Sequence, residues 1–273
     1  MKRLSWLCAT LLLLVGCNGQ ANEELEQQEE DEVVIEEAEE DNEQIEEESE
    51  LTEESIVAVE GEQEEPEPVY EINENSAVVP IDEADEQVVL LTIDDAPDQR
   101  AVEMAETLRE MNAEAIFFVN GHFILDQEGE EKLKAIYDMG FEIGNHTMSH
   151  PDLTEISAEQ TREEIIELND RIEDIIGERP RFFRAPYGKY SDLSKEIIEE
   201  EAMTFMNWTY GYDWESEYQS ADSLADIMVN TELLANGGNL LMHDRDWTAD
   251  ALQDIVNGLR EKGYHFVDPR EIK

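Results

Sequence analysis

Short apolar, β-branched runs alternate with amphipathic helical patterns from residue 87 to the end of the chain. Residues 88–93 are almost entirely apolar and predict a buried strand, and residues 100–111, with apolar positions three or four apart, predict a helix. Ser157 and Gly177 are expected to begin and end a long helix. The other predicted strands are residues 115–119, 141–144, 182–184, 204–208, 239–242 and 264–267, and the other predicted helices are 130–139, 158–176, 193–201, 221–234 and 249–262.

Strands that alternate with helices of this length indicate right-handed β-α-β units and a parallel sheet. The fold class is therefore α/β, with one domain of ordinary size at residues 87–273. The pattern leaves open whether the sheet closes into a barrel. In either arrangement, functional side chains gather at the carboxyl ends of the strands.

The first 17 residues have the pattern of an export signal. Lys2 and Arg3 precede an apolar stretch at residues 4–15, which is shorter than the ~20 residues of a membrane-spanning helix. The small residue before Cys17 makes this end similar to the lipobox of bacterial lipoproteins, in which that cysteine is lipidated. We expect residues 1–17 to be a lipoprotein signal peptide and Cys17 to anchor the chain to the extracellular face of the bacterial cell membrane. The alternative is an ordinary signal with an incidental cysteine.

Residues 18–86 are expected to form a disordered acidic linker. Between residues 23 and 86 there are 30 acidic residues and no lysine or arginine, so the segment lacks the apolar surface for a core and repels itself into an extended tether. Residues 87–273 still hold 41 acidic against 16 basic residues. A field of this sign repels nucleic-acid phosphates, which excludes a nucleic-acid partner.

Carboxylates and imidazoles stand where two predicted strands end. Asp94 and Asp95 close the first strand, and His146 and His150 follow the strand at residues 141–144. Carboxylate and neutral imidazole are usual protein ligands of Zn²⁺, and a catalytic site uses three ligands while leaving one position for water. The first hypothesis is therefore a metal-dependent hydrolase.

Five segments near strand ends make residues 87–273 resemble the polysaccharide deacetylase family, the carbohydrate esterases built on the NodB homology domain. The resemblance covers nearly the whole domain and keeps the family's motif order. It implies a distorted (β/α) barrel with about seven parallel strands. The matching segments are Thr92-Ile93-Asp94-Asp95, His146-Thr147-Met148-Ser149-His150, Arg184-Ala185-Pro186-Tyr187, Asp213-Trp214 and Leu241-Met242-His243.

The resemblance implies a metal site and an acid–base pair. Asp95, His146 and His150 would bind a divalent metal, usually zinc. Asp94 would be the general base and His243 the acid that protonates the leaving amine. These residue types suit the chemistry, because a carboxylate beside a metal can take the proton of an attacking water.

The remaining motif residues would support the reaction or hold the substrate. By the family pattern, Arg184 would hold and tune Asp94, and the backbone N–H of Tyr187 would stabilise the oxyanion. The expected substrate contacts are Trp214, Leu241, Pro186 and Asp213.

Two positions depart from the family pattern. The family usually has glycine after its two aspartates, whereas this chain has Ala96-Pro97, and a methyl group at Ala96 could narrow the mouth of the site. The fourth motif usually has an earlier aspartate that contacts the acid histidine, but Gly211 stands near that place. Whether Asp213 takes over the contact is open in the sequence.

Each assignment has a plainer structural alternative. Arg184 could be a surface arginine and His243 a core histidine. Trp208, inside a predicted strand, is expected to be a core aromatic, whereas Trp214 on the following loop is the better candidate for sugar stacking. His122 is expected to be a loop residue.

The resemblance and the export signal together favour a metal-dependent N-deacetylase acting on an N-acetylated polymer outside the cell. Peptidoglycan is the first expected substrate, chitin-like or poly-N-acetylglucosamine chains the second and acetylated xylan the third. We expect a monomer. The rival hypothesis is a tethered carbohydrate-binding protein with a decayed site.

Overall fold

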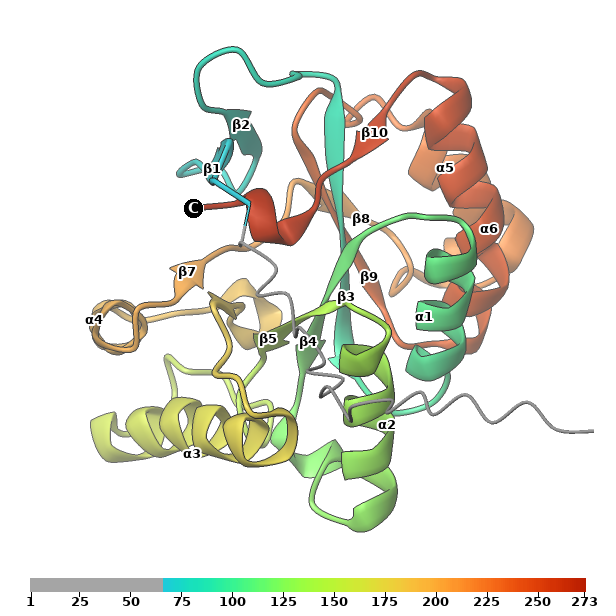
Figure 1. Cartoon of the computed structure of the whole chain (residues 1–273). Coiled ribbons are helices and arrows are strands. Elements are labelled where there is room, and N and C mark those ends of the chain that lie inside the picture. Colours follow the sequence, from blue (N-terminus) through green and yellow to red (C-terminus); the bar gives the residue numbers. More distant parts are fainter. Residues whose placement is uncertain (1–65) are drawn as a thin grey trace, which may run out of the picture. The chain divides into compact units, whose positions relative to one another are not determined.

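The computed structural model describes residues 66–273 (Figure 1). The expected signal peptide, the expected anchor residue Cys17 and the expected linker up to residue 65 lie outside the described residues. Across residues 66–273, no helix combines the length and apolar character needed to cross a membrane.

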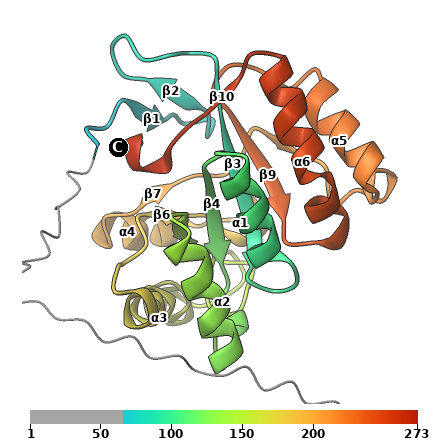
Figure 2. The same ribbon diagram turned by 45° about the vertical axis from the view of Figure 1, so that its right-hand side comes forward.

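One parallel sheet dominates the domain. Its strands are β3 (Val88–Ala96), β4 (Ala115–Val119), β5 (Glu142–Asn145), β6 (Phe182–Phe183), β7 (Thr204–Phe205), β8 (Tyr210–Gly211), β9 (Gly238–His243) and β10 (His265–Phe266). Seven of them follow the order β7, β6, β5, β4, β3, β9, β8, and β10 pairs with the first residues of β3. The sheet curls into a half-barrel (Figures 1 and 2). The predicted α/β fold, a distorted (β/α) barrel, is confirmed.

Helices connect the strands and pack on the sheet. Their bounds are α1 (Ala101–Glu110), α2 (Gln127–Asp138), α3 (Ala158–Ile176), α4 (Asp192–Glu200), α5 (Ala221–Asn230) and α6 (Asp246–Glu261). α3 has the predicted bounds, because Ser157 accepts a hydrogen bond from the Gln160 N–H at its start and Gly177 adopts a left-handed φ of 82° at its end.

Strand β3 is buried on both faces. Val89, Leu91 and Ile93 belong to the apolar core that includes the helices, and the alternate residues Val88 and Leu90 belong to a second core inside the half-barrel. A parallel strand covered on both sides needs apolar residues at nearly every position. This explains the unbroken apolar run that marks β3 in the sequence, and it holds the end of β3 rigidly in place.

The predicted start of the domain at residue 87 is too late. Residues 66–86, assigned to the disordered linker, contain an antiparallel hairpin of β1 (Tyr70–Ile72) and β2 (Val78–Pro80). Tyr70 and Val78 are buried in the inner core. The high acidic content of residues 18–86 predicted disorder for the whole linker. The short apolar stretch within it becomes ordered because its side chains are buried.

The hairpin lies at the edge where the long strands begin. The Val78 N–H donates to the Gly237 carbonyl at 2.9 Å, just before β9, and the Lys273 N–H donates to the Tyr70 carbonyl at 2.9 Å. Ser76 Oγ accepts from the Asn207 N–H at 2.8 Å, in the segment that joins the two edge strands β7 and β8.

The shortest strands were the least predictable. β6 and β7 contain two residues each, fewer than the predicted ranges 182–184 and 204–208. β8 was not predicted, because two residues show no period.

Candidate active site

The three expected metal ligands converge at the carboxyl ends of the strands. Asp95 lies near the end of β3, and His146 and His150 lie on the loop after β5. Their ligand atoms all lie within 4.8 Å of one another. Asp95 Oδ1 is 3.6 Å from His150 Nε2 and 4.0 Å from His146 Nε2. One carboxylate and two imidazoles at this spacing suit a divalent ion such as Zn²⁺.

His146 is held in the tautomer that a metal ligand needs. Its Nδ1 lies 2.8 Å from the carbonyl oxygen of Arg184, which can only accept, so Nδ1 carries the proton. Nε2 therefore keeps its lone pair and faces the triad. A backbone carbonyl in this outer position is a common way to orient a ligating histidine.

The loops around the triad have unusual backbone conformations. Asp95, Thr147, His150 and Tyr187 have φ values of 61°, 71°, 60° and 58°, in the left-handed region that residues other than glycine seldom adopt. The Thr147 N–H donates to Asn145 Oδ1 at 2.8 Å, and the His150 N–H donates to Thr147 Oγ1 at 3.1 Å. Such residues gather at sites where the surrounding structure imposes a geometry.

Arg184 is a fully buried partner of Asp94, so the alternative of a surface arginine is wrong. Its side chain is 0% exposed, and Nη1 donates to Asp94 Oδ1 and to Thr92 Oγ1, both at 2.7 Å. Nη2 donates to the Asn207 carbonyl at 2.8 Å and to Asn239 Oδ1 at 3.1 Å. These donors fix the Asp94 carboxylate in one orientation.

Asp94 is kept ionised despite its burial. Burial alone would raise the pKa of its carboxyl group, but the charges of Arg184, His146 and His243 outweigh it, and the pKa lies below its usual value. Asp94 Oδ2 is 3.5 Å from His146 Nε2. A carboxylate able to accept a proton therefore stands beside the triad.

His243 ends β9 opposite Asp94, and Asp213 orients it. Its Nδ1 lies 2.7 Å from Asp213 Oδ1, and its backbone N–H donates to Asp213 Oδ2 at 2.6 Å. Burial alone would lower the pKa of His243, but the hydrogen bond and charge of Asp213 outweigh it, so the pKa is raised. Asp213 thus makes the contact that the sequence left open, and His243 is not an ordinary core histidine.

Asp213 orients His243 from a buried position, and its predicted contact with substrate stays a prediction. Its side chain is 0% exposed, and its Oδ2 also accepts from Thr248 Oγ1 at 2.8 Å. Leu241 and Pro186, two further predicted substrate contacts, are likewise buried, and their contact with substrate stays a prediction.

Two aromatic side chains reach the surface of the site. Trp214 is 41% exposed, and its ring meets His243 edge-on at 5.7 Å between ring centroids. Tyr187 is 64% exposed and meets the His150 ring at 4.7 Å. Both expose an aromatic surface on which a sugar ring can stack.

Both departures from the family pattern have a packing reason. A Cβ at Gly211 would lie 2.4 Å from the Leu241 carbonyl oxygen and 2.8 Å from the Trp214 ring, so glycine allows Trp214 its position. Ala96 is fully buried in the apolar core between the sheet and the helices. Its methyl group therefore contributes to packing, and the expectation that it narrows the mouth is wrong.

The comparisons with known proteins agree with this geometry. A family model described as polysaccharide deacetylase matches residues 82–228, more than half of the chain. This chain belongs to the polysaccharide deacetylase family. Its motif residues lie at the carboxyl ends of the strands of a half-barrel.

Several family members are similar in sequence or structure. Peptidoglycan-N-acetylmuramic acid deacetylase PdaA of Bacillus subtilis is 30% identical over 169 residues, covering 60% of this chain and 62% of that protein. The structure of peptidoglycan deacetylase PdaC from Bacillus subtilis has a TM-score of 0.59 at 31% identity, covering 67% of this chain and 88% of that one. A pseudoenzyme of the CE4 family from Bacillus anthracis has a TM-score of 0.62 at 26% identity, covering 69% and 67%. The chain spans 34% to 63% of the length of curated relatives that it matches.

Two polar residues of this deacetylase domain were missed by the sequence reasoning. Buried Asp244 accepts from the backbone N–H groups of Gln99 and Arg100 and so ties the end of β9 to the start of α1. Arg245 Nη2 lies 3.7 Å from Asp95 Oδ2. Neither residue shows a signal in the sequence beyond its place within two residues of His243.

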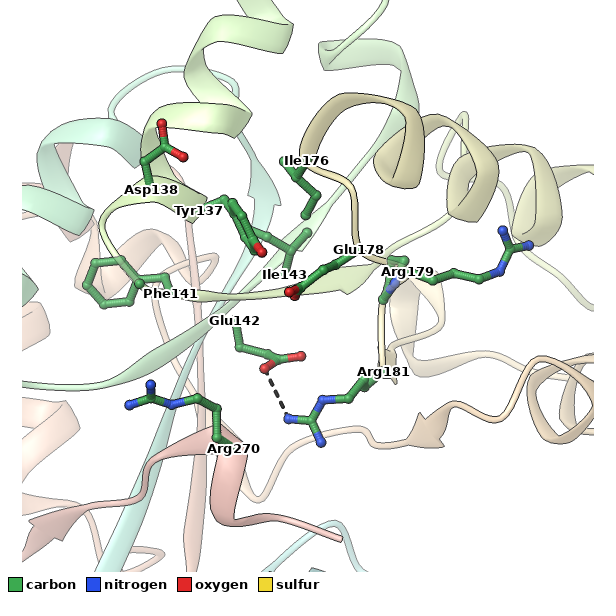
Figure 3. A pocket seen from close by; sticks show the side chains of 12 residues that line it. Tyr137, Asp138, Phe141, Glu142, Ile143, Ile176, Glu178, Arg179, Arg181 and Arg270 are labelled. Carbon is green, nitrogen blue, oxygen red and sulfur yellow. Dashed lines mark hydrogen bonds and ion pairs between the residues drawn. The ribbon is translucent and has the colours of Figure 1, made fainter. Parts of the chain in front are cut away.

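A cavity of about 690 Å³ lies elsewhere, at the opposite edge of the sheet, where β5 and β6 begin (Figure 3). Arginines line it, but they are paired with carboxylates: Arg181 with Glu142 at 3.0 Å and Arg179 with Glu201 at 2.7 Å. None of the site residues Asp94, Asp95, His146, His150 and His243 is among its lining residues. We therefore assign the chemistry to the carboxyl edge.

Proposed function

We propose that the chain is a metal-dependent N-deacetylase that removes acetyl groups from an extracellular polysaccharide. The observation that carries the proposal is the triad of Asp95, His146 and His150 with Asp94 on one side and the His243–Asp213 pair nearby. A bound divalent ion, which we take to be Zn²⁺, would supply Lewis acidity toward the acetamide carbonyl and toward a water molecule.

The chain's own residues supply the proton transfers. Asp94, held ionised by Arg184, takes a proton from the attacking water. The backbone N–H of Tyr187 donates to the oxygen that becomes negative. His243, protonated with the help of Asp213, gives its proton to the nitrogen as the C–N bond breaks. Acetate leaves, and the sugar keeps a free amine.

Peptidoglycan is the proposed substrate. Its support is that the relatives named above carry the names of peptidoglycan deacetylases. Chitin-like or poly-N-acetylglucosamine chains and acetylated xylan are the alternatives. We further propose that a lipid on Cys17 holds a monomeric enzyme at the extracellular face of the cell membrane, on the strength of the signal pattern in residues 1–17.

A carbohydrate-binding role with a decayed site is the second candidate, because a pseudoenzyme is among the similar structures. The same group includes a mutant of that protein with restored enzymatic activity. This chain retains three ligands, a buried ionised base and a positioned acid, which favours the enzyme.

The deciding experiment measures zinc content and acetate release from peptidoglycan, before and after chelation. We expect both to be lost on chelation and restored by Zn²⁺. Asp94→Asn should keep its zinc but lose about 10²- to 10⁴-fold in rate, whereas His146→Ala should lose zinc and rate together. Asp222→Asn, on the exposed start of α5, is the matched control and should behave as the wild type.

Two results would contradict the proposal. Zinc binding without acetate from any N-acetylated glycan would leave the carbohydrate-binding role. Full activity in Asp94→Asn would remove the base from the mechanism.

A further inference from the structure

Arg245 is a charged side chain in the site to which the proposed reaction gives no task. It follows His243 by two residues, immediately before α6, and its Nη2 lies 3.7 Å from Asp95 Oδ2. Its side chain is 33% exposed. The guanidinium therefore borders the triad and can be reached from solvent.

Most of the donors of Arg245 are not used within the described residues. A guanidinium has five N–H donors, yet the separation from Asp95 exceeds a hydrogen-bond length, and the buried Nε has no partner. A buried donor without a partner calls for an explanation. Arg184 Nε likewise has no partner, but the two Nη atoms of Arg184 donate four hydrogen bonds, and those of Arg245 donate none within the described residues.

An aromatic ring holds the guanidinium without occupying its donors. The guanidinium carbon lies 5.8 Å from the centroid of the Trp247 ring. The Trp247 indole N–H in turn donates to the Asp213 carbonyl at 2.8 Å. A cation–π contact at this distance attracts the guanidinium to the ring and leaves its N–H donors free.

Asp95 is a poor permanent partner for the charge of Arg245. Its Oδ1 faces the two imidazoles of the triad, where a divalent cation would neutralise the carboxylate. Arg245 would then be an uncompensated positive charge beside the substrate. The surrounding domain, with 41 acidic against 16 basic residues in 87–273, otherwise repels anions.

We propose that Arg245 binds a carboxylate on the substrate, so that the site prefers an N-acetylated sugar with an acidic substituent over a neutral one. Arginine matches a carboxylate with two parallel N–H···O bonds. The proposal rests on the deacetylase function above and names its substrate class. A neutral N-acetylhexosamine has no group for this contact, whereas N-acetylmuramic acid has one in its lactyl carboxylate.

The test uses glycan strands that contain N-acetylmuramic acid with unmodified lactyl carboxylates, and the same strands after methyl esterification. With zinc-loaded full-length protein, Arg245→Gln should lose about 10- to 100-fold in kcat/KM on the acid and stay within about twofold on the ester. Arg245→Lys should recover part of the loss. Arg109→Gln removes one positive charge from the exposed end of α1 and should change neither substrate.

Binding and metal measurements separate the possible failures. In an Asp94→Asn background, calorimetry should show tighter binding of the acid than of the ester, and this difference should vanish when Arg245→Gln is added. Carboxylate-dependent binding without acetate release would refute the deacetylase function and keep the role of Arg245. Equal acetate release from acid and ester would refute the role of Arg245 and keep the deacetylase function. Loss of zinc in Arg245→Gln, with equal loss on both substrates, would mean that Arg245 only positions Asp95.

Discussion

Strand β6 carries an arginine at each end, and the two arginines have different environments. Arg184, after the strand, is 0% exposed and its partner Asp94 is 3% exposed. Arg181, before the strand, is 44% exposed and its partner Glu142 is 15% exposed. The donor–acceptor distances are similar, at 2.7 and 3.0 Å. A similar ion pair thus lies at each end of the strands, Arg184–Asp94 at the carboxyl end and Arg181–Glu142 at the amino end.

The two carboxylates nevertheless shift in opposite directions. Burial is the largest influence on both and raises both pKa values. At Asp94, Arg184 and His146 outweigh burial, and the pKa falls. At Glu142, Arg181 opposes burial but the neighbouring Glu178 reinforces it, and the pKa rises (Figure 3). The comparison shows that the charges around an ion pair decide the direction in which the carboxyl pKa shifts, and so whether the carboxylate stays ionised and can serve as a base.

Replacing each arginine tests this difference with the largest expected effect. Arg184→Met leaves the buried Asp94 charge without a partner, so the free energy of unfolding should fall by about 3–5 kcal/mol and activity should be lost. Arg181→Met breaks a pair whose arginine is 44% exposed, and it should cost less, about 1 kcal/mol. Urea unfolding at neutral pH measures both. Equal losses would mean that burial does not distinguish the two edges.

Asp213→Asn should give the next largest effect. The carboxylate is what raises the pKa of His243, so the wild-type acid stays protonated to a higher pH than an ordinary histidine. Without it, the alkaline limb of the pH–rate profile should move to lower pH, and the maximal rate should fall by about 10²-fold. Asp268→Asn, which breaks the Asp268–Arg270 pair at the amino edge, should leave the profile unchanged. An unmoved limb in Asp213→Asn would refute the role of His243 as acid.

Gly211→Ala should give the smallest of these effects and act on binding. The added methyl group would press on the Leu241 carbonyl and the Trp214 ring, with an expected cost of about 1–3 kcal/mol in unfolding free energy. Because the ring must move, KM for a long glycan should rise more than kcat falls. Tryptophan fluorescence and steady-state kinetics check this. Unchanged KM together with a displaced ring would mean that Trp214 does not contact the substrate.

The sequence predicted the elements that have a clear period. The helix at Ala158–Ile176 has the predicted bounds, because its apolar face and both of its ends are encoded locally. The hairpin at Tyr70–Pro80 was missed, since its order depends on burial against the C-terminal residues, far away in the sequence. Two-residue strands such as Tyr210–Gly211 are too short to show any pattern.

The site residues likewise divide into those that the sequence could predict and those that depend on the fold. Asp94, Asp95, His146, His150 and His243 lie at or just after the carboxyl ends of strands, so their convergence could be expected from a parallel sheet. The partner of His243 was left open, because only the fold places Asp213 beneath it. Arg245 could not have been predicted, since its approach to Asp95 joins loops about 150 residues apart.

Under the proposed anchoring through Cys17, the hairpin β1–β2 would determine from which side the domain is held. It joins the body at the edge where β3 and β9 begin (Figure 1), whereas the triad lies where β3 ends. A pull applied through the residues that precede Tyr70 therefore acts on the edge opposite the catalytic mouth. The backbone hydrogen bonds that join the hairpin to Gly237 and Lys273 would bear that load, away from the end of the strands where the triad lies.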